Sequence, residues 1–126
     1  MAFRLEKEKT NSTPYVLIDE EKGYMKFEGR SFHENVAVFY TDVNDWLDTY
    51  LKKDFGSFTF DFEMNYFNSS TSKLMHNLLM KMDKYACEKN KVIVNWITTA
   101  DNDIIIECGE DFQEDINNLE FNMVIR

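Results

Sequence analysis

The stretch that most constrains the fold is an alternating strand that leads directly into a polar cap and an amphipathic helix. Large apolar side chains occupy every second position of the strand: Phe58, Phe60, Phe62, Met64 and Tyr66. This period of two is typical of a strand with one buried face. Apolar residues then recur every three or four positions from about Ser70 to Glu88, which predicts a helix with one buried face. The clean alternation suggests that helices cover mainly one face of the sheet.

The rest of the chain adds further elements. Four segments rich in β-branched and aromatic residues are predicted to be strands, the first two forming a hairpin: residues 15–18, 24–28, 92–97 and 121–125. Helical spacing predicts one long helix from Val36 to about Leu51 and a short acidic helix between Ile105 and Ile116. Residues 29–35 are predicted to be a loop.

The order ββαβαβαβ predicts a single-domain α/β fold, with a mixed sheet of about five strands and about three helices. At least one parallel pair should be joined by a crossover helix, because parallel neighbours need a long connection. The polar residues 1–12 are expected to be a flexible N-terminal leader, with the domain at residues 13–126.

Charge and hydropathy limit the classes of partner. Fourteen Lys and Arg against 23 Asp and Glu give a formal net charge of −9. This argues against nucleic acid or an anionic membrane as the main partner. The first nine residues lack the apolar core of a signal peptide and no run approaches transmembrane length, so a cytoplasmic protein is expected. Cys87 and Cys108 have no metal-type spacing and are predicted to be reduced structural thiols.

Four consecutive hydroxyl residues, Ser69 to Ser72, follow Asn68 at the predicted helix start. Backbone N–H groups are unpaired there and the helix dipole is positive. A phosphate added at this point would find hydrogen-bond donors. The alternative is a purely structural cap, a role open to Ser69, Ser70 or Thr71, with Asn68 capping the helix or holding the turn.

Several short motifs together resemble the SiaC family of regulatory phosphoproteins. In chain order they are Ser12-Thr13-Pro14, Gly29-Arg30-Ser31-Phe32-His33-Glu34-Asn35, Tyr66-Phe67-Asn68-Ser69-Ser70-Thr71-Ser72-Lys73, Trp96, Asp101-Asn102-Asp103 and Gly109-Glu110-Asp111. The segment from Tyr66 to Lys73 is the most specific. The family is similar in architecture to STAS domains of anti-anti-sigma factors, which carry a phosphorylatable Ser or Thr at the start of the corresponding helix.

The resemblance implies a non-enzymatic, cofactor-free partner-switching protein of the SiaC/STAS-like type. A Ser/Thr kinase of the anti-sigma type would phosphorylate Ser69, and a metal-dependent Ser/Thr phosphatase would reverse the modification. The unmodified form would bind an effector such as a diguanylate cyclase. The implied partner-binding residues are Asn68, Ser69, Ser70, Thr71, Lys73, Glu34 and Asn35. Two positions depart from the family pattern: Ser69 replaces the usual Thr, and His33 the usual Pro.

Two other functions compete with this interpretation. A hydrolase or transferase with Ser69 or Ser70 as nucleophile would need a base, and only His33 and His76 offer an imidazole. No GxSxG motif is present, so this function is disfavoured. A constitutive acidic scaffold or inhibitor could instead bind a basic partner through the first helix or residues 107–115, without control by phosphorylation.

The remaining polar residues receive structural predictions. Asp101 and Asp103 are too few to indicate a metal site and are predicted to cap the following helix, so no metal is expected. Glu34 and Asn35 could cap the first helix or contact a partner. His33 is predicted to lie in a surface loop, and His76 to be solvated.

Overall fold

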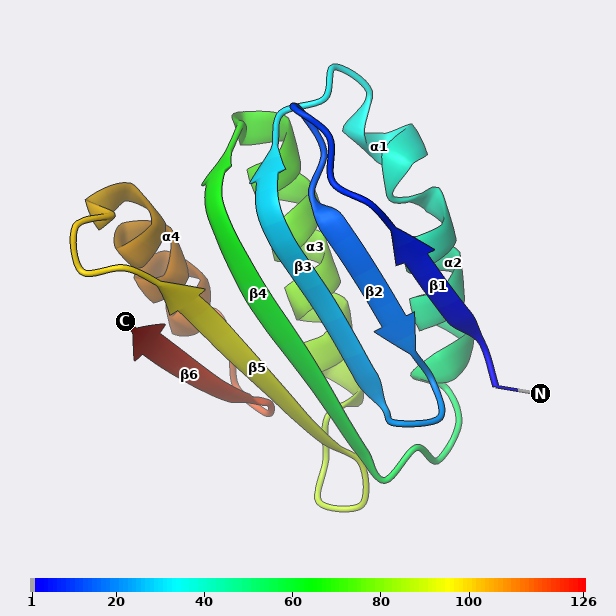
Figure 1. The fold of residues 1–126 in the computed structure, drawn as a ribbon. Coiled ribbons are helices and arrows are strands. Elements are labelled where there is room, and N and C mark those ends of the chain that lie inside the picture. The colour runs from blue at the N-terminus through cyan, green and yellow to red at the C-terminus, as the bar shows by residue number, and fades with distance from the viewer. Residues whose placement is uncertain (1) are drawn as a thin grey trace.

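The computed structural model describes residues 2–126 and contains one mixed sheet of six strands in the order β1-β2-β3-β4-β5-β6 (Figure 1). The strands are β1 (Arg4–Lys7), β2 (Tyr15–Asp19), β3 (Tyr24–Ser31), β4 (Ser57–Phe67), β5 (Lys91–Thr98) and β6 (Glu120–Ile125). The helices are α1 (Val36–Phe39), α2 (Thr41–Tyr50), α3 (Ser69–Tyr85) and α4 (Asp103–Glu114). The predicted α/β class and the order of the main elements are confirmed.

The predicted hairpin and crossovers are also confirmed. β2 and β3 are antiparallel, whereas β3–β4, β4–β5 and β5–β6 are parallel pairs joined through helices. At the hairpin turn Gly23 has a φ of +61°, and a Cβ there would lie 2.5 Å from the carbonyl oxygen of Ser57. Glycine is therefore required for both conformation and space.

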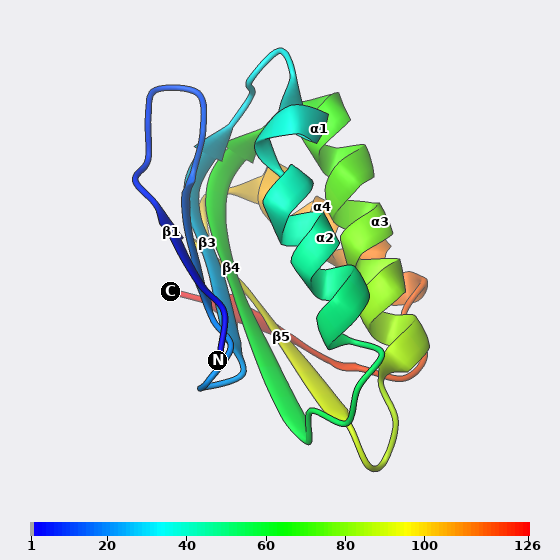
Figure 2. The same cartoon turned by 90° about the vertical axis from the view of Figure 1, so that its right-hand side faces the viewer.

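All four helices lie on the same face of the sheet (Figure 2). The core fills the layer between them and the sheet, where alternate strand side chains such as Phe60, Phe62 and Trp96 are fully buried. The opposite face carries no helix, and we call it the open face. The prediction of a sheet covered mainly on one side is confirmed.

An additional strand lies within the predicted leader. Arg4–Lys7 pairs antiparallel with β2, with Leu5 opposite Ile18. Leu5 packs against the core, Arg4 and Glu6 beside it are exposed, and Lys7 Nζ donates to Phe39 O at 2.9 Å. One apolar residue is too weak a signal for a strand, but pairing with the edge of β2 satisfies its backbone groups. Residues 4–7 of the predicted leader thus form a strand, and the sheet has six strands where about five were predicted.

The alternation of β4 ends earlier than predicted. Gly29 pairs with Met64 and the next residue, Arg30, pairs with Tyr66, so Asn65 is an extra residue in β4. Such a bulge reverses the faces of the residues that follow. Tyr66 therefore lies beside Arg30 on the open face, and Phe67 turns inward against Phe62 and Trp96. The prediction that Tyr66 continues the buried stripe is wrong.

Two other boundaries differ from the predictions. β3 continues to Ser31, so only the later part of the predicted 29–35 loop lacks regular structure. The long first helix is divided at Tyr40, which has φ −94° and ψ 8°. The Tyr40 hydroxyl is buried and lies 2.9 Å from Ser31 Oγ. The contact with Ser31 holds Tyr40 in the position where the helix breaks, whereas periodicity alone predicts a continuous helix.

Candidate functional site

Asn68 holds the start of α3 in place. Its side-chain Oδ1 accepts a hydrogen bond from Thr71 N at 2.9 Å, and its carbonyl oxygen accepts one from Ser72 N at 2.9 Å. Its own N–H donates to Ser31 O at 3.1 Å, which ties the helix start to the end of β3. The capping role considered for Asn68 is confirmed. Because Asn68 provides the cap, the exposed serines are not needed for it.

The hydroxyl residues of this segment have different environments. Ser69 and Ser70 are exposed, whereas Thr71 is completely buried. The Thr71 hydroxyl donates to Ser31 O at 3.1 Å and lies 3.0 Å from Ser31 Oγ. Thr71 is therefore a structural residue that joins α3 to β3. Ser69 and Ser70 are the hydroxyls that another protein could reach.

The electrostatics of this helix start favour an anion. The N–H groups of Thr71 and Ser72 are used by Asn68, which leaves those of Ser69 and Ser70 at the open end of a 17-residue helix. No acidic residue lies in the first turn. Lys73 is exposed and lies one turn after Ser69 on the same helix face. The arrangement can stabilise a phosphate on Ser69 through backbone donors and the helix dipole.

Glu34 and Asn35 lie at the start of α1, at the same end of the molecule as the start of α3 (Figure 1). Both are exposed, and Asn35 occupies the N-cap position without a side-chain capping bond. Instead, His33 Nδ1 accepts a hydrogen bond from Asn35 N at 3.0 Å. This bond orders the loop in which His33 replaces the usual Pro. Capping by Glu34 or Asn35 is not observed, and both side chains face solvent.

The two histidines do not form a catalytic site with the serines. The His33 ring bonds its own loop, and His76 Nε2 lies 3.0 Å from Asp115 Oδ2. His76 follows Ser69 by seven residues, or about 10 Å along the helix axis. Its ring also approaches Phe112, with 5.7 Å between centroids, so it is more ordered than the predicted solvated residue.

In the described part of the chain, the acidic loop before α4 and the two cysteines form no functional site. Asn102 Oδ1 caps α4 by accepting from Ile105 N, so the prediction that Asp101 or Asp103 provides the cap is wrong. The Asp101 carboxylate instead accepts from the Thr99 hydroxyl. Within residues 2–126 no group of three or more potential ligands could hold a metal ion. Both cysteines are free; Cys87 is exposed and Cys108 is partly buried.

A cluster beside the helix start was not identified from the sequence. The Arg30 guanidinium lies 5.4 Å from the Phe32 ring centroid and 5.7 Å from that of Tyr66. The two rings meet edge to face with centroids 5.8 Å apart. We call these three residues the aromatic–arginine patch. The bulge at Asn65 creates it, and no periodicity in the sequence marks that bulge.

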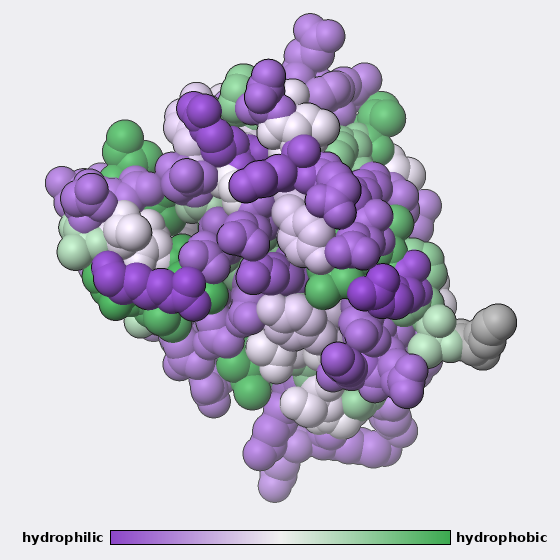
Figure 3. All heavy atoms as spheres, viewed as in Figure 1, coloured by the Kyte–Doolittle hydropathy of each residue, from purple (hydrophilic) through white to green (hydrophobic). Residues whose placement is uncertain are grey.

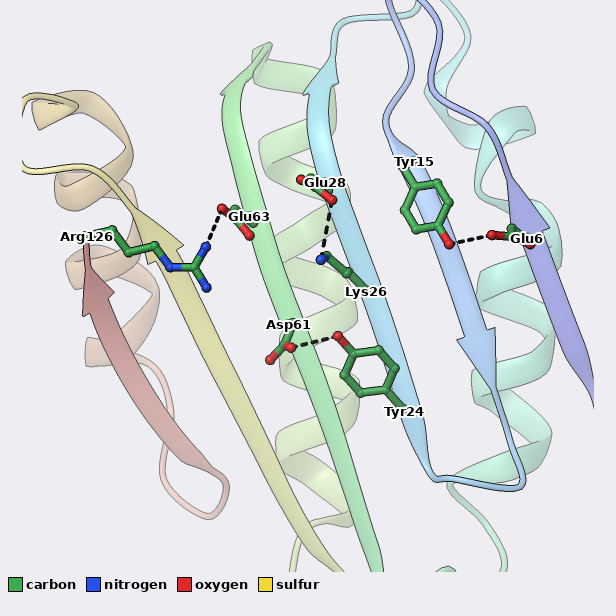
Figure 4. Close-up of polar contacts among 8 residues, drawn as sticks. All are labelled: Glu6, Tyr15, Tyr24, Lys26, Glu28, Asp61, Glu63 and Arg126. Atoms are coloured by element: carbon green, nitrogen blue, oxygen red, sulfur yellow. Dashed lines mark hydrogen bonds and ion pairs between the residues drawn. The ribbon is translucent and has the colours of Figure 1, made fainter.

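The open face is mostly hydrophilic, and its charged groups are largely paired (Figures 3 and 4). Arg126 Nη1 contacts Glu63 Oε2 at 2.9 Å, and Lys26 Nζ lies 3.4 Å from Glu28 Oε1. Two tyrosine hydroxyls donate to carboxylates, Tyr15 to Glu6 and Tyr24 to Asp61. The bond to Glu6 and burial raise the pKa of Tyr15 to about 12. Burial and the bond to Asp61 also raise the pKa of Tyr24.

No helix in residues 2–126 is both long and apolar enough to cross a bilayer.

Comparison with known proteins identifies the family. The model of the SiaC family regulatory phosphoproteins matches residues 7–126. An uncharacterized protein of Pseudomonas aeruginosa strain UCBPP-PA14 is 27% identical over 106 residues, which are 84% of each chain. The solved SiaC of P. aeruginosa superposes with a TM-score of 0.87 at 24% identity, covering 98% of this chain and 99% of that one.

A second solved relative is found with a partner. The crystal structure of the P. aeruginosa diguanylate cyclase SiaD in complex with its activator SiaC gives a TM-score of 0.88 at 25% identity. It covers 97% of this chain and 99% of that chain. Motifs, fold and family model agree over nearly the whole sequence, and the chain therefore belongs to the SiaC family of regulatory phosphoproteins.

Proposed function

We propose that this chain is a non-enzymatic, cytoplasmic signalling switch that is reversibly phosphorylated on Ser69 and binds an effector in its unmodified form. A Ser/Thr kinase of the anti-sigma type adds the phosphate, and a metal-dependent Ser/Thr phosphatase removes it. The observation that carries the proposal is an exposed serine at the first position of α3, with no acidic residue in the first turn. The effector is a diguanylate cyclase, by analogy with the SiaC relative that activates SiaD.

The switch acts at the surface. A phosphate adds about −1.5 to −2 charges at neutral pH. The helix terminus favours an anion by about 0.3–2 kcal/mol, so the modified domain stays folded. A partner that buries Ser69 would then enclose a charge without compensation, which costs several kcal/mol. Phosphorylation therefore releases the partner without reshaping the domain.

The proposed partner-binding surface combines two exposed segments at one end of the molecule. Around α3 it includes Ser69, Ser70 and Lys73, and before α1 it includes Glu34 and Asn35. Asn68 and Thr71 act differently, because one caps the helix and the other is buried. They position the surface and offer a partner little side-chain area.

Kinase treatment tests the acceptor. The purified chain is incubated with a Ser/Thr kinase of the anti-sigma type from the same organism and Mg-ATP, and phosphate is mapped by mass spectrometry. Modification is expected on the intact protein and on Ser70→Ala, and it should be lost in Ser69→Ala. Ser69→Thr tests whether the kinase discriminates between the two hydroxyls. Phosphate confined to another residue would contradict the proposal.

Effector binding tests the switch itself. A diguanylate cyclase of the same organism should bind the unmodified chain and Ser69→Ala, but not the phosphorylated chain or Ser69→Glu. The matching phosphatase should restore binding. Equal affinity of the cyclase for all these forms would show that binding is constitutive and would contradict the proposed switch.

A constitutive acidic scaffold remains the competing function because α4 presents several exposed carboxylates, including Glu107, Glu110 and Asp111. Binding of a basic partner there would weaken steeply with salt. It would also be the same for Ser69→Glu and the unmodified chain. A salt titration on both forms separates the two functions.

A further inference from the structure

The aromatic–arginine patch of Arg30, Phe32 and Tyr66 is an exposed apolar and cationic surface beside Ser69. We propose that it binds a segment of the effector in which a carboxylate is flanked by apolar side chains, and that phosphate on Ser69 turns this binding off. The regulatory half of the inference rests on the function proposed above. The binding half stands on the geometry of the patch.

The aromatic rings of the patch hold the Arg30 guanidinium at the surface. Phe32 is 37% exposed and Tyr66 is 45% exposed, although both are large hydrophobic residues. Arg30 is exposed and lies within 6 Å of both ring centroids, at a distance typical of cation–π contacts. The two rings restrict the side chain before any partner arrives, which lowers the entropy cost of binding.

Arg30 differs from Lys26 and Arg126 on the open face in having no carboxylate partner among the described residues. Lys26 and Arg126 are each paired with a glutamate of the same sheet (Figure 4). Arg30 forms no ion pair with any carboxylate in residues 2–126, in a chain whose net charge is −9. Its charge is therefore available to a ligand.

This chemistry selects the partner. A guanidinium has a planar fork of donors that matches a carboxylate in two parallel hydrogen bonds. The exposed rings of Phe32 and Tyr66 are best buried against apolar side chains of a partner. Arg and Tyr are also enriched among residues that dominate the energy of protein interfaces. An acidic segment with apolar neighbours satisfies all three residues, whereas nucleic acid would be repelled by the strongly acidic chain.

The patch and Ser69 are close enough to influence one another. Tyr66 precedes Ser69 by three residues, which span at most about 11 Å of chain. The Asn68 N–H donates to the carbonyl oxygen of Ser31, and Ser31 lies between Arg30 and Phe32 in the sequence. A phosphate on Ser69 would therefore add about −1.5 to −2 charges at the junction of β3 and α3 that also carries Arg30. It would neutralise the guanidinium or repel the acidic segment.

A peptide titration tests the binding half without the effector. The probe is a short acetylated peptide that alternates leucine with aspartate, and matched peptides carry lysine or serine instead of aspartate. The aspartate peptide should shift the amide NMR signals of Arg30, Phe32 and Tyr66, and bind about tenfold more tightly than the serine peptide. The lysine peptide should not bind. Equal binding of the aspartate and serine peptides would overturn the proposal.

Variants of the patch and of a neighbouring lysine test where the peptide binds. Arg30→Gln and Phe32→Ala should each weaken the aspartate peptide by about tenfold or more. Lys26→Gln removes one positive charge from the same face and should leave binding within about twofold. Arg30→Lys keeps the charge but loses the planar fork, so intermediate binding is expected. If Lys26→Gln weakened binding as much as Arg30→Gln, the patch would not be the site.

Phosphorylation separates this inference from the proposed function. Ser69→Glu and the kinase-treated chain should lose the aspartate peptide, while Ser69→Ala should retain it. A peptide that binds the patch equally in all forms would overturn the regulatory half while Ser69 phosphorylation stood. If the kinase did not modify Ser69, the proposed function would fail, and the titration of Arg30→Gln would still decide whether the patch binds acidic segments.

Discussion

α4 approaches the sheet closely at Gly109. A Cβ at this position would lie 2.5 Å from Trp96 Nε1 and 2.9 Å from Met123 Sδ. The indole cannot easily move, because its N–H donates to Ile105 O at 2.9 Å and its ring stacks on Phe62. Contacts this short force neighbouring side chains or the helix to shift. Glycine here has a packing function that outweighs its poor helix propensity.

Replacement of Gly109 by alanine should therefore destabilise the fold. Alanine gains about 0.8–1.0 kcal/mol of helix propensity, whereas overpacking of a well-filled core costs about 1–3 kcal/mol or more. We expect a net loss of about 1–2 kcal/mol, measured by urea denaturation followed through tryptophan fluorescence. Glu110→Ala, on the exposed side of the same helix, should stay within about 0.5 kcal/mol. Stability of Gly109→Ala at or above the parent value would contradict this packing account.

For single residues, the sequence located the candidate site but did not assign roles to the residues in it. It identified the hydroxyl cluster and the helix start, because cap residues and periodicity are local signals. It did not distinguish buried Thr71 from exposed Ser69, because the burial of Thr71 depends on Ser31, 40 residues away. Arg30 likewise stands out in the sequence only as one member of a motif. Its aromatic neighbours meet only through the pairing of β3 with β4.

Among the elements, α3 is connected to the end of the chain by one buried carboxylate. Asp83 Oδ1 accepts hydrogen bonds from Asn118 N at 2.7 Å and Leu119 N at 2.9 Å. Its Oδ2 accepts from Asn117 N at 3.1 Å, and its backbone oxygen accepts from Asn118 Nδ2 at 3.0 Å. Successive N–H groups around one carboxylate fix the turn between α4 and β6. The helix that carries Ser69 thus also orders the edge of the sheet.

Asp83→Asn should loosen this turn. The amide keeps one acceptor oxygen but presents an NH2 group to backbone donors, and an unsatisfied buried donor costs about 1–3 kcal/mol. We expect a loss of that size, with faster hydrogen exchange at Asn117, Asn118 and Leu119. Asp115→Asn breaks only the exposed pair with His76 and should cost about 0–1 kcal/mol. Unchanged exchange in Asp83→Asn would show that the turn is held by other contacts.

The element predictions succeeded where the signal was local and long. Periodicity located α3, α4 and the strands β2 to β6 to within a few residues. It failed at β1, where one apolar residue in four gives no pattern and the strand depends on β2 as its partner. It also failed at the Asn65 bulge and at the break at Tyr40. Both depend on contacts with β3, which sequence periodicity does not contain.

For the molecule as a whole, the strand order explains why one face is open. From β3 to β6 each new strand is added on the same side of the one before it. Parallel connections are almost always right-handed, so successive crossovers in one direction place every helix on the same face. Within residues 2–126 the strand order does not reverse, so the sheet has no topological switch point of the kind found in nucleotide-binding sheets. The open face is instead stabilised by polar pairs, two of which use the hydroxyls of Tyr15 and Tyr24.

Four tyrosines, two on the open face and two in the core, make the stability of the molecule sensitive to alkaline pH. Burial raises the pKa of Tyr40 and Tyr50, burial with the Asp61 bond raises that of Tyr24, and the Glu6 bond with burial raises that of Tyr15. A raised folded-state pKa contributes stability that is complete below the ordinary tyrosine value of about 10. The contribution is lost as pH rises through the folded values, because the unfolded chain ionises first.

The free energy of unfolding should therefore be level with respect to these tyrosines up to about pH 9 and fall above about pH 10. Each tyrosine that ionises only in the unfolded chain contributes a slope of up to about 1.4 kcal/mol per pH unit. Urea denaturation across this range measures the slope, and tyrosinate absorbance of the folded protein reports the delayed ionisation. Tyr40→Phe keeps the buried ring and should reduce the slope by about one group's contribution. A slope unchanged in Tyr40→Phe, or tyrosinate absorbance that develops fully at the ordinary pKa before unfolding, would show that these hydroxyls are solvated in the folded protein.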